Sequence, residues 1–505
     1  MSRTVRLNPL DAAWLLTESR ATPNHVGGLL TFRLPEGASR DFLSRMMADF
    51  RAHREFAPPW NRKLKYAFTK NPVPVWLEVG NDEIDLEYHV RHAALPWPGG
   101  ERELGELVGR LHSTPIDLSR PPWECTIIEG LDGDRFAFFI KMHHSLIDGV
   151  SGMKMLVNTM AGDARRSESL PAFWAVGMGK PRAAREKRPA PTMANVSASV
   201  LEGLSAQAQS LPQLVSAFAK IIKRIGDPRD GLAVPFDAPR SSLNGRVREK
   251  RRFATQQFPI ARLRAVAEMG GGTINDVVLV LCGTALRRFL QERGELPDKP
   301  LTAGIPVSVR PADDEGTGNA ISFIVATMGT DVDDPVERLR AVRASVRHAK
   351  DHVQSLPRHA MTQYTMLLMA PSVLTLLTGA GGRTPPMFNC TISNVPGPDK
   401  PLYYRGAQLL AVYPASIITH GQALNITCES YNGQMNFGLT ACHSSVPRVQ
   451  RLAVYLSDAL DELEAALQPR SPRKRPAVPA KKAASRPSVK RAGKPRPPSQ
   501  VASSG

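Results

Sequence analysis

The chain has 505 residues, more than one hydrophobic core ordinarily organises, so we expect two domains with additional segments. Hydrophobic residues make up 42% and charged residues 22%, a balance typical of globular proteins. The five cysteines are odd in number and form no CxxC pair, which argues against a disulfide framework or a zinc site and for a reducing compartment. Residues 1–6 lack the apolar run of a signal peptide.

The positive charge is concentrated at the C-terminal end. The formal net charge is +18, and the stretch from Arg470 to the end holds eleven Lys or Arg residues and no acid, which leaves +7 for the rest. This tail consists mainly of Pro, Lys, Arg, Ala and Ser, so it lacks the apolar surface that would offset its ordering entropy, and we predict disorder. The high pI is therefore a property of the tail and not a nucleic-acid-binding signature of the whole fold.

Changes in composition divide the remainder. A stretch rich in Gly, Pro and Arg at about 162–193 predicts a linker or long crossover, and a helical pattern follows it over 194–224. A polar segment over 226–251 then leads into the second half. We therefore expect an N-terminal lobe over 1–165, a linker with crossover helices over 166–240, a C-terminal lobe over 241–468 and a tail over 469–505.

The first half contains a predicted hairpin, in which apolar runs at 123–129 and 135–142 flank the turn signal Asp132-Gly133. Helical patterns follow in the second half over 260–269, 274–292 and 334–356. A second hairpin is predicted there, with 425–431 and 434–440 around Asn432-Gly433. Both halves mix strands with helices, which predicts an α/β (α+β) fold with largely antiparallel or mixed sheets. No GxGxxG after a strand, P-loop or metal-ligand spacing is present.

The strand at 135–142 leads into the segment with the strongest chemical signal. It is apolar on both faces, so we predict a central strand. It runs directly into His143-His144-Ser145-Leu146-Ile147-Asp148-Gly149, and a helical pattern begins at Val150. This position, at the junction of a buried strand and a helix, can hold a side chain rigidly while it faces a cleft.

Imidazole suits proton abstraction near neutral pH, because its free pKa is about 6.5. Asp148 can hold the local geometry through backbone amides or an arginine, and Gly149 would permit a close or left-handed backbone. His-His pairs are commonly structural, however, and Asp-Gly is a common turn, so the pattern by itself leaves both interpretations open. No G-x-S-x-G serine elbow is placed to complete a hydrolase triad.

HHSLIDG matches the HHxxxDG motif of the acyltransferase superfamily related to chloramphenicol acetyltransferase, which also includes nonribosomal condensation domains. Further motifs, in the same order over about 5–465, resemble bacterial wax ester synthase/diacylglycerol acyltransferases. They are Leu7-Asn8-Pro9-Leu10-Asp11, Glu18, Pro23-Asn24-His25-Val26-Gly27-Gly28-Leu29, Leu95-Pro96-Trp97-Pro98-Gly99-Gly100, Asn275-Asp276, Gly304-Ile305-Pro306-Val307-Ser308-Val309-Arg310, Gly318-Asn319 and Ser393-Asn394-Val395-Pro396-Gly397-Pro398. One departure is Pro121-Pro122-Trp123 in place of the family's Pro-Leu-Trp; we expect it to affect shape and not activity.

The resemblance implies two chloramphenicol-acetyltransferase-like lobes with the site in a tunnel between them. It implies acyl transfer from acyl-CoA, as co-substrate, to diacylglycerol or a long-chain alcohol, without a metal, another cofactor or a covalent acyl-enzyme. His144 would be the catalytic base, and His143, Asp148 and Gly149 would support it. Arg310 is a candidate partner for Asp148.

Three residues of the matched motifs have two interpretations each. Asn275 could donate to the developing oxyanion, or it could cap the helix that follows, and Asp276 has the same ambiguity. Glu18 could be a surface helix residue, but the match makes it a candidate site residue.

Two other functions stay open. One is a condensation-type acyltransferase acting on carrier-bound acyl groups, and the other is a non-enzymatic lipid-binding protein. The basic tail could bind anionic lipid or nucleic acid, and composition does not choose between them. We expect a cytoplasmic protein in peripheral contact with the inner membrane or lipid droplets.

Overall fold

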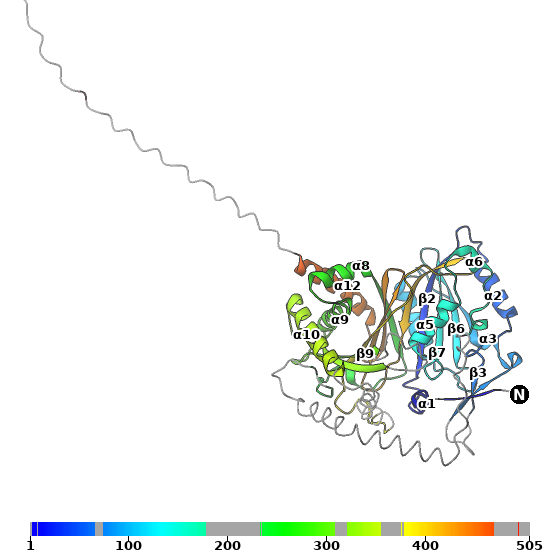
Figure 1. The fold of residues 1–505 in the computed structure, drawn as a ribbon, viewed down its shortest axis with the longest axis horizontal. Helices are drawn as coiled ribbons and strands as arrows, with labels where there is room; N and C mark the ends of the chain where they lie inside the picture. Colours follow the sequence, from blue (N-terminus) through cyan, green and yellow to red (C-terminus); the bar gives the residue numbers. More distant parts are fainter. Residues whose placement is uncertain are drawn as a thin grey trace, which may run out of the picture. The chain divides into compact units, whose positions relative to one another are not determined.

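The computed structural model describes residues 3–7, 9–65, 74–177, 233, 235–308, 321–354, 375, 378–468 and 493 (Figure 1). The chain divides into two compact units, Met1–Leu467 and Gln468–Gly505. All the helices and strands named here belong to the first unit. The tail predicted to be disordered lies outside the described residues apart from Gly493, and so does the crossover pattern over 194–224.

The first of two six-stranded sheets in the described residues has the strand order β12-β13-β2-β7-β6-β5. Neighbouring strands are antiparallel except β5 and β6, which run parallel. Its strands are β2 (His25–Arg33), β5 (Val90–Ala94), β6 (Trp123–Leu131), β7 (Arg135–His143), β12 (Tyr403–Tyr404) and β13 (Ala407–Ala415). Around it lie α1 (Pro9–Leu16), α2 (Phe42–Ala52), α3 (Leu86–His89), α4 (Glu101–Ser113), α5 (Gly149–Asn158) and α6 (Ala164–Glu168), with a small sheet of β1 (Thr4–Arg6), β3 (Arg62–Lys65) and β4 (Val75–Glu78).

The second six-stranded sheet has the order β10-β9-β11-β14-β15-β8 and is also mixed, because β11 runs parallel to both of its neighbours. Its strands are β8 (Arg251–Pro259), β9 (Thr302–Ser308), β10 (Ile321–Thr327), β11 (Cys390–Val395), β14 (Leu424–Tyr431) and β15 (Gln434–Cys442). Its helices are α8 (Ile260–Met269), α9 (Ile274–Gln291), α10 (Pro335–Gln354) and α12 (Val449–Leu467), which gather together in Figure 1. The predicted mixed α/β architecture is confirmed.

The local sequence signals correspond to observed elements. Both predicted hairpins form, with positive φ at Gly133 and Asp134 in the first turn and at Asn432 and Gly433 in the second. The helices predicted at 260–269 and 274–292 are α8 and α9. The strand predicted to be central is β7, which lies between β2 and β6.

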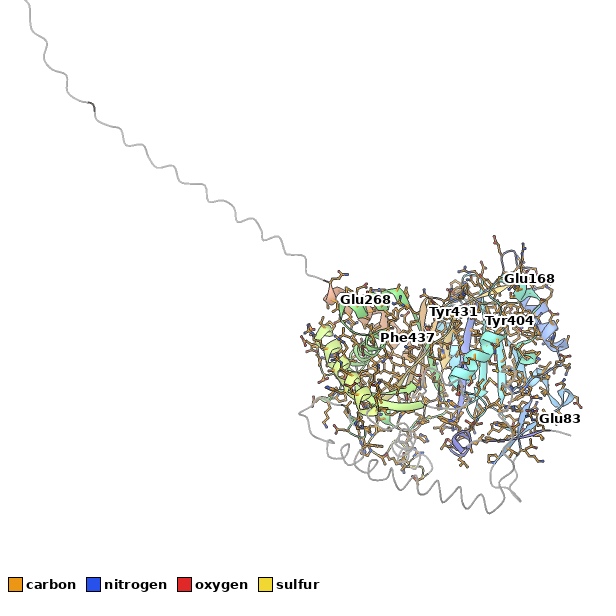
Figure 2. The ribbon with its side chains drawn as sticks, in the orientation of Figure 1. Glu83, Glu168, Glu268, Tyr404, Tyr431 and Phe437 are labelled. Carbon is orange, nitrogen blue, oxygen red and sulfur yellow. The ribbon has the colours of Figure 1, made fainter. Side chains whose placement is uncertain are left out.

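The two six-stranded sheets contact each other at two places. β13 comes from the C-terminal half of the sequence but pairs with β2 in the first sheet, and the carbonyl oxygen of its Pro414 lies so close to Gly438 of β15 that a Cβ there would collide with it. At the second place α4 packs on β8, where a Cβ at Gly105 would lie 2.6 Å from the carbonyl oxygen of Phe253. Figure 2 labels Tyr431, whose hydroxyl donates to the carbonyl oxygen of Leu409 on β13 at 3.0 Å.

The segment 166–177, which we expected to be part of a linker, packs on the first sheet. Phe173 and Trp174 are buried beside Phe50 of α2, and Trp174 Nε1 donates to the carbonyl oxygen of His53 at 3.3 Å. The Pro- and Gly-rich composition around Phe173 and Trp174 predicted a linker. The burial of these two aromatic side chains stabilises the packed conformation more than the composition disfavours it.

Candidate active site

The motif HHSLIDG lies at the predicted junction, because β7 ends at His143 and α5 begins at Gly149. Asp148 is the N-cap of α5, and its Oδ1 accepts a hydrogen bond from the Ser151 amide at 2.7 Å. A carboxylate at this position satisfies a free amide of the first turn and faces the positive end of the helix dipole. Asp148 thus holds its local geometry through a backbone amide, and its candidate partner Arg310 lies outside the described residues.

The expectation for Gly149 is wrong. This glycine is the first helical residue of α5 and does not adopt a positive φ. A Cβ built at this position would have no atom of the described residues within 4 Å. Neither a left-handed backbone nor a close approach therefore requires glycine here.

His143 is fully buried and bonded through both ring nitrogens. Its Nδ1 accepts a hydrogen bond from the Ser145 amide at 3.2 Å and lies 2.6 Å from the Ser145 hydroxyl. The proton therefore resides on Nε2, which pairs with the carboxylate of Glu18. Because both ring nitrogens of His143 are bonded, neither is free to take a proton from substrate, and this suits the supporting role predicted for His143. Glu18, a candidate from the motif match alone, contacts the motif directly.

His144 has a different environment. The residue is half-buried, its amide donates to the Asn24 carbonyl oxygen at 2.9 Å, and its ring lies 4.4 Å from that of Trp14. Its Nδ1 is enclosed and has no hydrogen-bond partner among the described residues. Burial lowers the pKa of the imidazole to about 4, and His143 adds to this effect while Asp148 opposes it. His144 is therefore neutral at pH 7, the state that a general base requires.

A second carboxyl group lies near Asp148. Burial and, to a smaller extent, the charge of Asp148 together raise the pKa of Asp11, on α1, to about 6. Sequence reasoning gave Asp11 and Trp14 no role in the site. Their spacing of three residues, with Glu18 four residues beyond, was the available signal, because it places the three on one side of a helix.

A buried cation anchors the strand that carries the motif. Lys141 on β7 is only 2% exposed and forms an ion pair with Glu124 at 3.2 Å. Its Nζ also donates to the carbonyl oxygens of Leu111 and Thr114, at 3.1 and 2.7 Å. These carbonyls end α4, where a cation is favourable. The contacts fix the end of β7, two residues before His143, against α4.

The departure at Pro121-Pro122-Trp123 leaves its surroundings intact. The Pro122 carbonyl oxygen accepts a hydrogen bond from the His143 amide at 3.0 Å, and proline keeps that acceptor although it lacks a donor. Trp123 is fully buried, and its Nε1 donates to the Trp60 carbonyl oxygen at 2.8 Å.

The remaining candidates, Asn275 and Asp276, lie in the first turn of α9. Thr273 is the N-cap, and Asp276 Oδ2 accepts from the Thr273 amide and hydroxyl, both at 2.8 Å. This capping box accounts for Asp276 structurally. Asn275 is half-buried and makes no side-chain hydrogen bond within the described ranges, so its oxyanion role stays a prediction. No cluster of His, Cys, Asp or Glu suited to a metal ion occurs in the described part of the chain.

Comparisons with known proteins agree with the motif matches. Residues 7–278 match the wax ester synthase/diacylglycerol acyltransferase catalytic domain, and residues 317–464 match the C-terminal domain of the same family. A putative diacylglycerol O-acyltransferase of Mycobacterium tuberculosis is 44% identical over 499 residues, which cover 92% of this chain and 98% of the relative. The O-acyltransferase WSD of Acinetobacter baylyi is 38% identical, with 91% and 96% covered.

Solved structures show the same relation. The wax ester synthase/diacylglycerol acyltransferase of Marinobacter aquaeolei matches with a TM-score of 0.72 and 36% identity over 92% of this chain and 99% of its own. The first condensation domain of the calcium-dependent antibiotic synthetase has a TM-score of 0.56 at 16% identity, with 93% and 97% covered, which shows a shared two-lobe fold alone. The chain therefore belongs to the wax ester synthase/diacylglycerol acyltransferase family of acyltransferases.

Proposed function

We propose that this chain transfers a fatty acyl group from acyl-CoA to the free hydroxyl of diacylglycerol, forming triacylglycerol, and to long-chain alcohols, forming wax esters. The observation that carries the proposal is the half-buried, neutral imidazole of His144 at the end of β7, in a chain of this family. The names of the relatives include diacylglycerol acyl transfer and wax ester synthesis, which supports a site open to either acceptor.

The proton has a complete route through His144. The imidazole takes the proton of the acceptor hydroxyl while the oxygen bonds to the thioester carbonyl carbon. The C–S bond then breaks, and the CoA thiolate leaves with the proton from His144. An imidazolium with a pKa of about 4 is a stronger acid than free imidazolium, so it returns the proton readily. The charge of Asp148 opposes the burial effect and stabilises the imidazolium while it exists.

Two further residues have proposed parts. Asn275 is our candidate donor to the oxyanion, where one well-placed donor contributes roughly 3 kcal/mol. Arg310 is our candidate partner for the carboxylate of Asp148. The support for both is their place in the matched motifs.

An acceptor competition tests the proposal. Purified chain receives palmitoyl-CoA with dioleoylglycerol and hexadecanol at equal concentration, and the products are separated by mass. We expect triacylglycerol as the main product and wax ester as a second. Release of CoA without either ester would overturn the assignment to lipid synthesis.

A condensation-type activity on carrier-bound acyl groups and non-enzymatic lipid binding are the alternatives. The same assay with an acyl-carrier thioester in place of palmitoyl-CoA separates the first, because a condensation-type enzyme would prefer the carrier. A lipid-binding protein would retain dioleoylglycerol and release no CoA from either donor.

We further propose that the chain works in the cytoplasm, in peripheral contact with the inner membrane or lipid droplets. Within the described residues no lone helix has the length and apolar character to cross a bilayer; α8 and α9 reach that threshold only as a pair, bent by 93°. Two features support the proposed peripheral contact. The acceptor is insoluble in water, and the tail carries a charge of +11, which anionic lipid would attract.

Deletion of residues 470–505 should weaken flotation with anionic phospholipid vesicles, most strongly at low salt, while esterification in detergent persists. Unchanged flotation would mean that the tail is not the tether, and equal retention on RNA would favour nucleic acid as its partner.

A further inference from the structure

One short segment near the N-terminus interacts with three side chains of the motif, those of His143, His144 and Asp148. α1 ends at Leu16, and the amide of Thr17 still donates to the Ala13 carbonyl oxygen at 3.1 Å, so the helical path continues toward Glu18. Asp11 and Trp14 lie three residues apart in α1, and Glu18 lies two residues beyond its end. The charge of Asp148 acts on Asp11, the ring of Trp14 lies against that of His144, and Glu18 pairs with His143.

The contact between Trp14 and His144 is a ring-on-ring contact. The two centroids lie 4.4 Å apart and the planes are inclined by 32°, so the indole covers one face of the imidazole. On the same ring, Nδ1 is enclosed without a hydrogen-bond partner among the described residues. A base whose ring is not held through Nδ1 depends on packing for its orientation.

A single buried residue, Asn24, ties the backbone of Trp14 to that of His144. Asn24 is fully enclosed, and its Nδ2 donates to the Trp14 carbonyl oxygen at 2.7 Å and to Thr17 Oγ1 at 3.0 Å. The main-chain carbonyl oxygen of Asn24 accepts from the His144 amide at 2.9 Å. The indole and the imidazole are therefore fixed to one another at the main chain as well as at the rings.

We infer that Trp14 is a positioning residue of the acyl transfer, whose indole holds the imidazole of His144 in its working orientation and shields it from water. This inference rests on the proposed role of His144 as the base. The indole packs on the ring of the base, so its loss should act on the rate of the chemical step. A misplacement of the base by about 1 Å is enough to slow a reaction by roughly a hundredfold.

Three variants of the full chain separate positioning from simple packing. Trp14→Phe keeps an aromatic face, whereas Trp14→Leu keeps apolar volume without a ring. Trp97→Leu is the matched control, because Trp97 is 94% exposed and the same substitution there removes an indole from the surface. The thermal midpoint of each variant identifies any that fails to fold.

We expect Trp14→Leu to lower kcat by about tenfold to a hundredfold with little change in KM. Trp14→Phe should recover most of the rate, and Trp97→Leu should match the wild type. Equal kcat for folded Trp14→Leu and wild type would overturn the inference, and so would a change confined to KM.

A labelling experiment without substrate keeps the inference distinct from the proposed function. Diethyl pyrocarbonate modifies neutral imidazole, and fragment-ion mass spectrometry distinguishes His144 from His143. His144 should react several times faster in Trp14→Leu than in wild type or Trp14→Phe, while His143 stays unreactive because it is buried. Equal His144 reactivity in all variants would refute the shielding role even in an active enzyme. Faster labelling together with a wild-type chain that makes no ester would support the contact and refute the proposed function.

Discussion

His144→Ala should lower kcat for ester formation by roughly a thousandfold, within the range that a general base contributes. The substitution removes the only proposed acceptor for the hydroxyl proton. The free energy of unfolding should fall by only about 1 kcal/mol, for the lost ring contact with Trp14. The Nδ1 atom has no hydrogen bond among the described residues that the substitution would remove. The measurement is kcat at saturating acyl-CoA, with the thermal midpoint recorded for the same preparation.

His143→Ala is the matched control for this prediction. It leaves the base in place but breaks the links to Glu18 and Ser145, so Glu18 loses a buried partner. We expect a loss of stability of about 1–3 kcal/mol and a smaller fall in kcat than for His144→Ala. Full activity of His144→Ala would refute the assignment of the base, and equal losses of kcat in folded proteins would refute the division of roles.

Glu429→Gln should make the protein markedly more stable above pH 7 and leave it nearly unchanged at about pH 4. Glu429 lies on β14, is 5% exposed and faces Asn436 of β15. Its Oε1 has no hydrogen-bond partner in the described ranges, and burial raises the pKa of the carboxyl group to about 8. An unfolded glutamate has a pKa of about 4.3.

The direction follows from proton linkage. Between about pH 4.3 and pH 8 the folded protein holds a proton on Glu429 that the unfolded chain has released, so stability falls as pH rises. The loss approaches about 1.4 kcal/mol per pH unit and roughly 5 kcal/mol in all. A glutamine has the same shape and no titration, so this part of the pH dependence should vanish.

Thermal midpoints of wild type and Glu429→Gln, measured from pH 4 to pH 8, test this prediction. The two curves should meet at about pH 4 and separate steadily above it. Glu268→Gln, at an exposed position labelled in Figure 2, is the control and should follow the wild type throughout. Parallel curves for wild type and Glu429→Gln would show that the folded pKa of Glu429 is ordinary.

The predictable parts of the fold are those with local signals. Asn432 and Gly433 supply the positive φ of one turn and Gly133 and Asp134 that of the other, and α8 and α9 follow uninterrupted helical periodicity. The pairing of β13 with β2 could not be predicted, because it joins residues nearly four hundred positions apart and no local pattern records the partner. Trp174 was assigned to a linker for the same reason, since its burial depends on distant residues.

The site divides in a similar way. The motif match predicted His144 as the base and His143 as its support. The bonds of His143 to Ser145 and Glu18 leave its ring no free nitrogen, and the role of His144 stays a prediction. The interpretation of Gly149 failed because a glycine at a helix start needs no special backbone. Asp11 and Trp14 were missed because α1 reaches the motif only through the tertiary fold.

The central claim is that the chain esterifies a lipid hydroxyl directly from acyl-CoA. Its most direct test counts both products at once, with purified full-length chain, palmitoyl-CoA and dioleoylglycerol, by thiol titration of CoA and mass spectrometry of triacylglycerol. We expect one triacylglycerol for each CoA released. CoA release without matching ester, with hexadecanol equally unable to capture the acyl group, would contradict the claim.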